Sequence, residues 1–374
     1  MSASIQSTAL EPDPGFDGDA LSLWQRLARA VPVYGLVVLT VALALLFSLI
    51  LPDTFPTWFN LRAILSDKSV IALLALAAMI PMVTGKIDLT VGYGIVLWHI
   101  LAISLQTRFG LPWPAAVVLV LLCAAASGML NGLLVELAQI DSFIATLGTG
   151  TVIYSLAMWH SGGRQVVGEL PDGFLAIAGS TMLGLPVGAF YVLAVAVALW
   201  LASEFTPLGR ALYVIGANPK AAQLNGISVR KHVLGAFVAS GMLSGFAGVL
   251  LASRLQIGQA SVGLEFLLPA LVGAFLGSTT IRPGRVNVWG TLVGVAILAI
   301  GISGIQQLGG AFYVEPLFNG MTLLVSIGIA GWAQQRRNQS IKRRIAERQL
   351  AVESSTPMAG GLPACPSTTN EEKR

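Results

Sequence analysis

Ten long apolar segments constrain what this chain can fold into. A helix crosses a bilayer with about 20 mostly apolar residues. The sequence supplies ten such stretches, at about residues 31–51, 69–84, 89–105, 114–135, 142–160, 186–203, 233–253, 264–280, 286–306 and 312–332. Only 11% of the 374 residues are charged, against about 25% in soluble domains. We therefore predict an all-α membrane protein with about ten transmembrane helices.

Basic residues predict the orientation of these helices, because lysine and arginine accumulate in cytoplasmic connections. With a cytoplasmic N-terminus and ten spans, the outer segments hold five basic residues. These five are Arg62, Lys68, Arg108, Arg164 and Arg254. All the others of the chain's 22 basic residues then fall inside. Both termini are therefore predicted to be cytoplasmic. The second and third spans alternatively form one broken helix pair that meets around residues 85–88.

The polar ends of the chain suggest a three-part organisation. Residues 1–25 are predicted to be a disordered cytoplasmic tail, because this segment is polar and acidic. Residues 26–335 form the transmembrane domain, with a polar coupling loop at 204–232. Residues 336–374 form a second cytoplasmic tail, first basic and then disordered. Its basic residues are typical of charges that anchor a helix end to lipid headgroups.

The sequence lacks the motifs of common enzymes. No G-x-x-x-x-G-K-[ST] loop for nucleotide phosphates occurs, and neither does G-x-S-x-G or H-E-x-x-H. The two cysteines, Cys123 and Cys365, offer no metal-ligand spacing, and the three histidines are far apart. We therefore predict that the chain is not an enzyme and that it binds no cofactor or metal.

Two charges interrupt the apolar sequence at residues 85–92, GKIDLTVG. Lys86 and Asp88 stand between two predicted spans. At membrane depth a charge costs about 2.5–3.5 kcal/mol and is usually functional, whereas in an interfacial turn it costs little. Both placements are compatible with the sequence. The small-residue span at 142–163 is likewise compatible with core packing or with a substrate path.

The longest polar interruption, residues 207–227, is typical of a segment that faces a soluble partner. We predict a short helix there. Asn218 is suited to cap it, Pro219 fits its first turn, and Gly226 allows a left-handed end. Its expected apolar contact face consists of Ala221, Ala222 and Leu224.

Four motifs occur in order along the chain. They are GKIDLTVG at 85–92, NG at 131–132 with FIATLG at 143–148, GRALYVIGANPKAAQLNGI at 209–227, and the series Glu265, Gly277, Gly284, Gly290, Thr291 and Gly294. In this order they resemble the permease subunits of ribose/xylose-type sugar ABC importers, whose superfamily includes the branched-chain amino acid permeases. The resemblance covers about residues 51–332. Lys86 replaces a common glycine, and residues 268–270 and 280–284 also depart from the pattern.

The resemblance implies a bacterial inner-membrane protein that translocates a small neutral sugar, such as a pentose, hexose or related polyol. Two permease subunits, identical or different, form the pore within membrane lipid. Separate ATPase subunits bind below, a periplasmic sugar-binding protein delivers the solute, and no nucleic acid is involved. The ATPase-coupling helix is expected to use Asn218, Pro219, Ala221, Ala222, Leu224 and Gly226. The translocation path or its gate is expected to use Asp88, Thr90, Asn131, Phe143, Thr146 and Glu265.

Two alternatives follow from the same residues. One alternative is a branched-chain amino acid or other small-solute ABC permease of the same superfamily. A secondary transporter driven by an ion gradient is the other alternative. Such a transporter places ionisable residues at membrane depth, and only Asp88 and Glu136 are expected near that depth.

Overall fold

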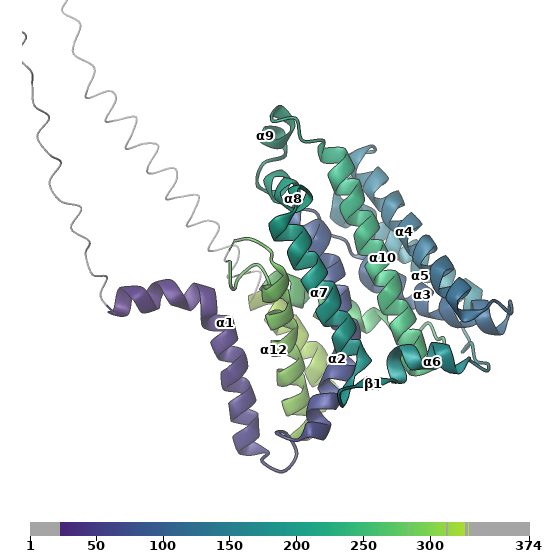
Figure 1. The fold of residues 1–374 in the computed structure, drawn as a ribbon, viewed down its shortest axis with the longest axis horizontal. Coiled ribbons are helices and arrows are strands. Elements are labelled where there is room, and N and C mark those ends of the chain that lie inside the picture. The colour runs from purple at the N-terminus through teal and green to yellow at the C-terminus, as the bar shows by residue number, and fades with distance from the viewer. Residues whose placement is uncertain (1–22, 283, 312, 326–327, 329–374) are drawn as a thin grey trace, which may run out of the picture. The chain divides into compact units, whose positions relative to one another are not determined.

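The computed structural model describes residues 23–282, 284–311, 313–325 and 328. Nearly all of the two predicted tails, the basic cluster after residue 335 and the end of the last predicted span lie outside these residues. Within them the chain is almost entirely helical (Figure 1). The elements are α1 (Leu23–Ile50), α2 (Trp58–Val83), α3 (Thr90–Thr107), α4 (Trp113–Glu136), α5 (Ser142–Ser161), α6 (Asp172–Gly179), β1 (Thr181–Met182), β2 (Leu185–Pro186), α7 (Val187–Phe205), α8 (Pro207–Ala217), α9 (Pro219–Leu224), α10 (Val229–Leu255), η1 (Leu264–Phe266), α11 (Leu267–Leu276) and α12 (Val288–Gln307). β1 and β2 form an antiparallel hairpin.

The prediction of an all-α membrane protein is confirmed. Among the described residues, seven helices are long and apolar enough to cross a membrane, namely α2, α3, α4, α5, α7, α10 and α12. Three shorter apolar helices, Tyr34–Ile50, Leu264–Leu276 and Val314–Val325, fall on the other three predicted spans. Ten membrane crossings therefore stay a prediction.

Helix α2 is longer than the sequence suggested. The predicted span began at residue 69, but α2 begins at Trp58. Its first half carries Asp67 and Lys68, which form an ion pair at 3.0 Å, and Asp67 also accepts from Arg254 of α10 at 2.5 Å. Because neighbouring side chains neutralise these charges, the helix can include them. Hydropathy alone had predicted a connection between helices at these residues.

Contacts between connections define two ends of the helix assembly. At the α8–α9 end, the Ile87 amide donates to the Ser142 hydroxyl at 3.1 Å, and the Tyr213 hydroxyl donates to the Val286 carbonyl at 2.9 Å. At the α6 end, Arg108 donates to the carbonyl of His160 at 3.0 Å. Consecutive helices from α2 to α5 therefore run antiparallel to each other.

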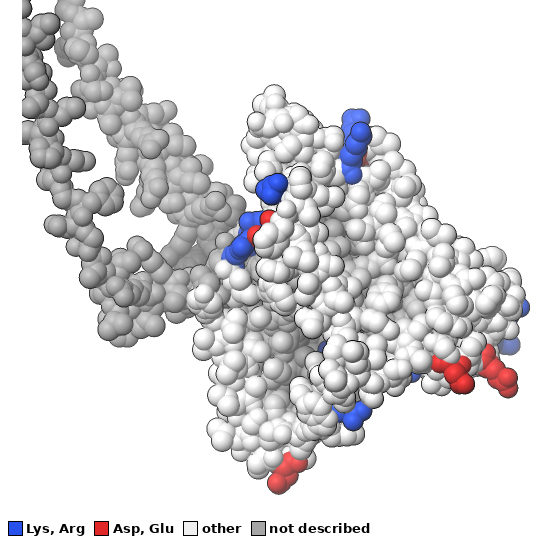
Figure 2. Space-filling view, in the orientation of Figure 1, with Lys and Arg blue, Asp and Glu red and all other residues white. Residues whose placement is uncertain are grey.

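The two ends differ in charge (Figure 2). Among the described residues, the α8–α9 end carries seven basic side chains, at residues 86, 210, 220, 230, 231, 282 and 285, and three acidic ones, at 136, 141 and 204. The α6 end carries five basic side chains, at 62, 68, 108, 164 and 254, and five acidic ones, at 53, 67, 169, 172 and 315. The five basic residues predicted to share one side of the membrane therefore lie at one end of the structure.

Glycines bring α4 and α10 into close contact. A Cβ atom on Gly128 would lie 2.2 Å from the carbonyl oxygen of Phe237, and one on Gly241 would lie 2.3 Å from that of Ala124. Small residues allow this approach between membrane helices. Gly128 belongs to SGMLNG at 127–132, and Gly241 belongs to the similar SGMLSG at 240–245. The faint repetition in the sequence thus corresponds to the contact between these two helices.

We predict that Gly128→Ala destabilises the protein. The new methyl group meets a backbone carbonyl that has no rotamer to adopt, and overpacking of this kind costs about 1–3 kcal/mol. Gly148→Ala on α5 is the matched control, because a Cβ there meets no atom within 4 Å. The measurement is the melting temperature in detergent micelles. Equal melting temperatures for the two variants would contradict the close contact.

Candidate functional site

A buried carboxylate stands directly before α3. Asp88 is 0% exposed. Its Oδ1 atom accepts from the backbone amide of Thr90 at 2.9 Å and from the Thr90 hydroxyl, and its Oδ2 atom accepts from the Ser240 hydroxyl of α10 at 2.8 Å. The N-terminus of α3 adds the positive end of a helix dipole. Burial of a charge is tolerated when it is paired or hydrogen-bonded, and Asp88 meets this condition with three donors.

Asn131 extends these bonds to two further helices. Its amide nitrogen donates to the Thr90 hydroxyl oxygen at 3.0 Å, and its Oδ1 atom accepts from the Thr149 hydroxyl at 2.5 Å. We call Asp88, Thr90, Asn131, Thr149 and Ser240 the Asp88 network. It connects α3, α4, α5 and α10. Polar groups that lack water must find partners inside the protein, so the network fixes how these four helices meet.

The non-helical residues before α3 also depend on α5. The amide of Leu89 donates to the Thr146 hydroxyl at 3.1 Å, and the amide of Ile87 donates to the Ser142 hydroxyl at 3.1 Å. The Thr146 hydroxyl donates to the carbonyl of Ser142 at 2.7 Å. The first turns of α5 therefore supply the partners that an interrupted helix would otherwise lack.

The network lies well inside the helix assembly. Its member Ser240 is in the fourth turn of α10, which begins at Val229. A rise of 1.5 Å per residue places Ser240 about 16 Å from the α8–α9 end of that helix. Lys86 lies nearer the end, where its Nζ is 4.0 Å from Oε1 of Glu136. Asp88 is therefore fully buried in the helix assembly, whereas Lys86, two residues away, is half-buried beside Glu136. Whether the segment lies at membrane depth or in an interfacial turn stays a prediction.

Four of the six residues predicted for the path are thus brought together, namely Asp88, Thr90, Asn131 and Thr146. Phe143 is not part of the network. Its side chain is 48% exposed on α5. The sequence prediction missed the hydroxyls of Ser142, Thr149 and Ser240. Ser240 opens the second copy of the repeated hexapeptide, which was the available signal.

Glu265 lies apart from the Asp88 network, but it is beside α3, which carries Thr90 of that network. It is in η1 and is exposed, and its Oε2 atom accepts from the amide of Gly263 at 3.0 Å. A Cβ on Gly263 would lie 3.0 Å from the Val96 side chain, and one on Gly92 would lie 2.4 Å from Cβ of Leu267. The η1 turn therefore lies against the first half of α3. Glu265 is a charged, exposed residue at that level.

The predicted coupling loop is built of helices. The structure confirms the short helix and its ends: Asn218 Oδ1 accepts from the amide of Ala221 at 3.1 Å, Pro219 is the first residue of α9, and Gly226 has φ of 79°. It corrects the rest of the segment, because residues 207–217 form the additional helix α8. Thr206 caps α8 by accepting from the amide of Gly209 at 3.3 Å.

The expected contact face of α9 divides into two parts. Ala222 is 0% exposed and belongs to a core cluster with Val135, Ala145, Ile215, Val229, Val233 and Phe237. Leu224 is 89% exposed. Ala222 therefore holds α9 against the chain, and Leu224 is the large apolar side chain that α9 presents outward.

Helix α8 is tied to the turn before α12. The guanidinium of Arg285 lies 3.4 Å from the ring centroid of Tyr213, whose hydroxyl donates to Val286. Arg282 forms an ion pair with Glu204, and Arg285 lies 3.9 Å from the same carboxylate. Burial raises the pKa of the Tyr213 hydroxyl, and the hydrogen bond to Glu204 raises the pKa of Arg282. Arg282 belongs to the segment 280–284, where the sequence departs from the family pattern, and Arg285 follows it directly.

Comparison with known proteins gives a match over most of the chain. The family model described as branched-chain amino acid transport system / permease component matches residues 60–330. The ribose import permease protein of Haemophilus influenzae is 31% identical over 290 residues, which cover 77% of this chain and 89% of that protein. The D-allose transport system permease protein of Escherichia coli is 27% identical over 296 residues, covering 79% and 90%. The autoinducer 2 import system permease protein of the same species is 30% identical over 288 residues, covering 76% and 86%. No solved structure gives a significant match.

We predict that Asp88→Ala is much more damaging than Asp88→Asn. Alanine leaves the buried hydroxyls of Thr90 and Ser240 without their acceptor, and each unsatisfied group costs about 1–3 kcal/mol. Asparagine keeps an acceptor for Thr90 and offers Ser240 a donor. The melting temperature of each purified variant in detergent tests this. Similar losses for both variants would show that the ionised carboxylate, rather than the hydrogen-bond network, is what the site requires.

Proposed function

The chain belongs to the permease component family of branched-chain amino acid transport systems, and within it we propose that the chain is the membrane subunit of an ATP-binding-cassette importer for a small neutral sugar. Its relatives are transport permeases, and the prediction that it is not an enzyme is confirmed. The sugar assignment rests on relatives named for ribose and D-allose import, of which this chain covers about nine tenths. A pentose, a hexose or a related polyol fits this class.

The α8–α9 element supports a role in coupling to ATPase subunits. It is a compact pair of capped helices at one end of the membrane helices, and it presents Leu224 outward while Ala222 anchors it. The excess of basic residues at this end favours the cytoplasmic side of a bacterial inner membrane. ATPase subunits bind there in this proposal, and a periplasmic sugar-binding protein delivers its solute at the α6 end.

The contacts of α8 suggest how movement passes into the membrane. Closure of the ATPase subunits displaces α9 and with it α8. Tyr213 and Arg285 carry that displacement to the turn before α12, and α10 follows directly after α9. The Asp88 network connects α10 to α3, α4 and α5. Alternating access then arises from rocking of these helices around a central path.

Glu265 supports a path beside the first half of α3. An exposed carboxylate at membrane depth is costly in lipid, so such residues face a partner or a water-filled cavity. We therefore place Glu265 at the surface where a second permease subunit, identical or related, completes the pore. A carboxylate there accepts hydrogen bonds from sugar hydroxyls. Phe143 on α5 is the apolar member of the proposed path.

The alternatives receive less support. The family description names branched-chain amino acids, but the relatives named for ribose and D-allose import favour a sugar. Ion coupling needs an ionisable group that changes partners. Asp88 already has three donors, and Glu136 lies 4.0 Å from Lys86.

We predict that Leu224→Glu weakens association with the ATPase subunits at least about tenfold, which is the loss expected for an apolar anchor at an interface centre. Leu183→Glu is the matched control, because Leu183 is 84% exposed at the opposite end. Co-purification from membranes measures the association, and melting temperatures check that both variants fold. Unchanged association for Leu224→Glu would contradict the coupling role.

We predict that Glu265→Gln lowers sugar uptake about tenfold, because a hydrogen bond to a charged group contributes about 1.5–3 kcal/mol. The assay is ATP-dependent uptake into proteoliposomes that hold the chain with its ATPase and binding-protein partners. Labelled pentoses, hexoses and branched-chain amino acids are compared in the wild-type protein. Uptake of amino acids without sugars would contradict the proposed substrate class.

A further inference from the structure

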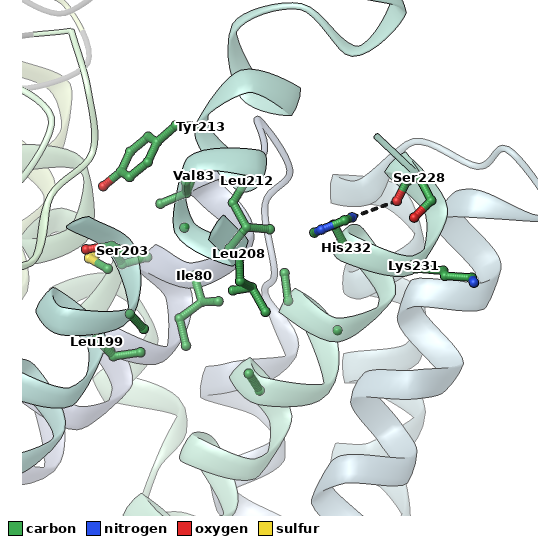
Figure 3. A pocket seen from close by; sticks show the side chains of 16 residues that line it. Ile80, Val83, Leu199, Ser203, Leu208, Leu212, Tyr213, Ser228, Lys231 and His232 are labelled. Carbon is green, nitrogen blue, oxygen red and sulfur yellow. Dashed lines mark hydrogen bonds between the residues drawn. The ribbon is translucent and has the colours of Figure 1, made fainter. Parts of the chain in front are cut away.

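A groove runs beneath α8, between α2, α7 and α10 (Figure 3). Its volume is about 500 Å³, which is within the range of ligand sites. The wall from α2 includes Ile80, the wall from α7 includes Leu199, and α8 contributes Leu208 and Leu212. None of the contacts described above fills this space, and the coupling mechanism does not use it.

The polarity of the groove changes along its length. Its polar lining residues are Ser203, Tyr213, Ser228, Lys231 and His232, which lie at the last turn of α7, on α8 and at the start of α10. Further from the α8–α9 end, α2 and α10 contribute Met79, Ala236 and Ala239. The groove is therefore polar at its mouth and apolar further in. A lipid in a leaflet has the same order, with its headgroup at the surface and its acyl chains in the interior.

The mouth of the groove is basic. The Nδ1 atom of His232 donates to the Ser228 carbonyl at 2.8 Å, and Figure 3 shows the imidazole on the groove side of α10. Lys231 also lines the mouth, is exposed and has no ion pair with a described residue; Figure 3 shows its ammonium turned away from Leu208 and Leu212, so its flexible side chain must turn to meet a ligand in the groove. Helix α7 forms the outer wall, and only 11% of its apolar stretch is buried. A membrane lipid therefore has access to the groove from the side.

We propose that the groove binds an acyl chain of an anionic phospholipid, whose phosphate lies at His232 and Lys231. An acyl chain that moves from the lipid tails into the groove leaves one apolar medium for another and gains little. Selectivity therefore comes from the headgroup, where a lysine near the membrane surface contributes about 1 kcal/mol with anionic lipid.

A lipid in this position separates α8 from α10. The orientation of the coupling element then depends on the anionic lipid content of the membrane. This consequence rests on the proposed function of α8–α9. The binding of the lipid does not rest on it, so the two can fail independently.

The test uses two variants of the full chain, each with its own control variant. A Cβ on Gly235, which lines the groove, meets no atom within 4 Å. Gly235→Leu therefore introduces a large side chain into the groove from a position where its Cβ has space. Gly320→Leu is the matched control, because Gly320 also meets no atom within 4 Å and does not line the groove. Lys231→Gln removes the headgroup charge, and Lys220→Gln on α9 is its control.

The purified chain in phosphatidylcholine nanodiscs is titrated with phosphatidylglycerol that carries a photoreactive tail, and the labelled peptides are mapped by mass spectrometry. We expect tail labelling at residues of α8 or α7 that line the groove. Gly235→Leu should reduce this labelling at least about tenfold, which corresponds to loss of contacts worth about 1.4 kcal/mol. Lys231→Gln should weaken binding about fivefold, from the single charge lost.

Three results would overturn the proposal. Labelling that Gly235→Leu leaves unchanged would place the lipid elsewhere. A photoreactive phosphatidylcholine that labels equally well would exclude recognition of an anionic headgroup. Replacement of the lipid label by a crosslink to the ATPase subunit, once that subunit is bound, would identify a protein segment as the occupant.

Discussion

The structure depends on how a chain with few charges satisfies its polar groups away from water. The demand is greatest at residues 84–89, where the chain leaves the helical conformation between α2 and α3 and Asp88 is fully buried. Hydroxyls of α5 accept from the free amides, Thr90 and Ser240 donate to the carboxylate, and Asn131 joins Thr90 to Thr149. Four helices are thereby held in one relative arrangement. The glycine contact of α4 with α10 lies beside this network, so close packing and polar satisfaction support each other.

The same arrangement links the centre of the chain to its α8–α9 end. Helix α10 carries Ser240 in its interior and follows α9 directly in sequence. Helix α8 is held on another side by Tyr213 and Arg285 at the turn before α12. The α8–α9 element is therefore joined both to α10 and to the turn before α12. The groove beneath α8 leaves space on a third side, where a lipid would set the resting position of the element.

Much of this could be predicted from the sequence, because apolar length and capping chemistry are local properties. Asn218, Pro219 and Gly226 have the roles that their residue types indicated, and Asp88, Thr90, Asn131 and Thr146 do lie together. Residues that depend on tertiary partners were missed. The start of α2 was not predicted, because Asp67 and Lys68 interrupt the apolar sequence there. Arg254, which pairs with Asp67, is nearly two hundred residues away in the sequence. Helix α8 was hidden within a polar segment, because an amphipathic surface helix lacks a long apolar run. The burial of Ala222 and the contribution of Ser240 follow from packing between distant helices, which no single motif records.

The side of the membrane on which α8 and α9 lie tests this account most directly. Single cysteines at Leu224 and Leu183, which are 89% and 84% exposed, are introduced after Cys123 and Cys365 have been replaced by serine. A membrane-impermeant maleimide is then applied to intact spheroplasts and to inverted membrane vesicles. The account predicts labelling of Leu224→Cys in inverted vesicles alone and of Leu183→Cys in spheroplasts alone. The reverse pattern would place α8–α9 away from the ATP-containing side and contradict the proposed coupling.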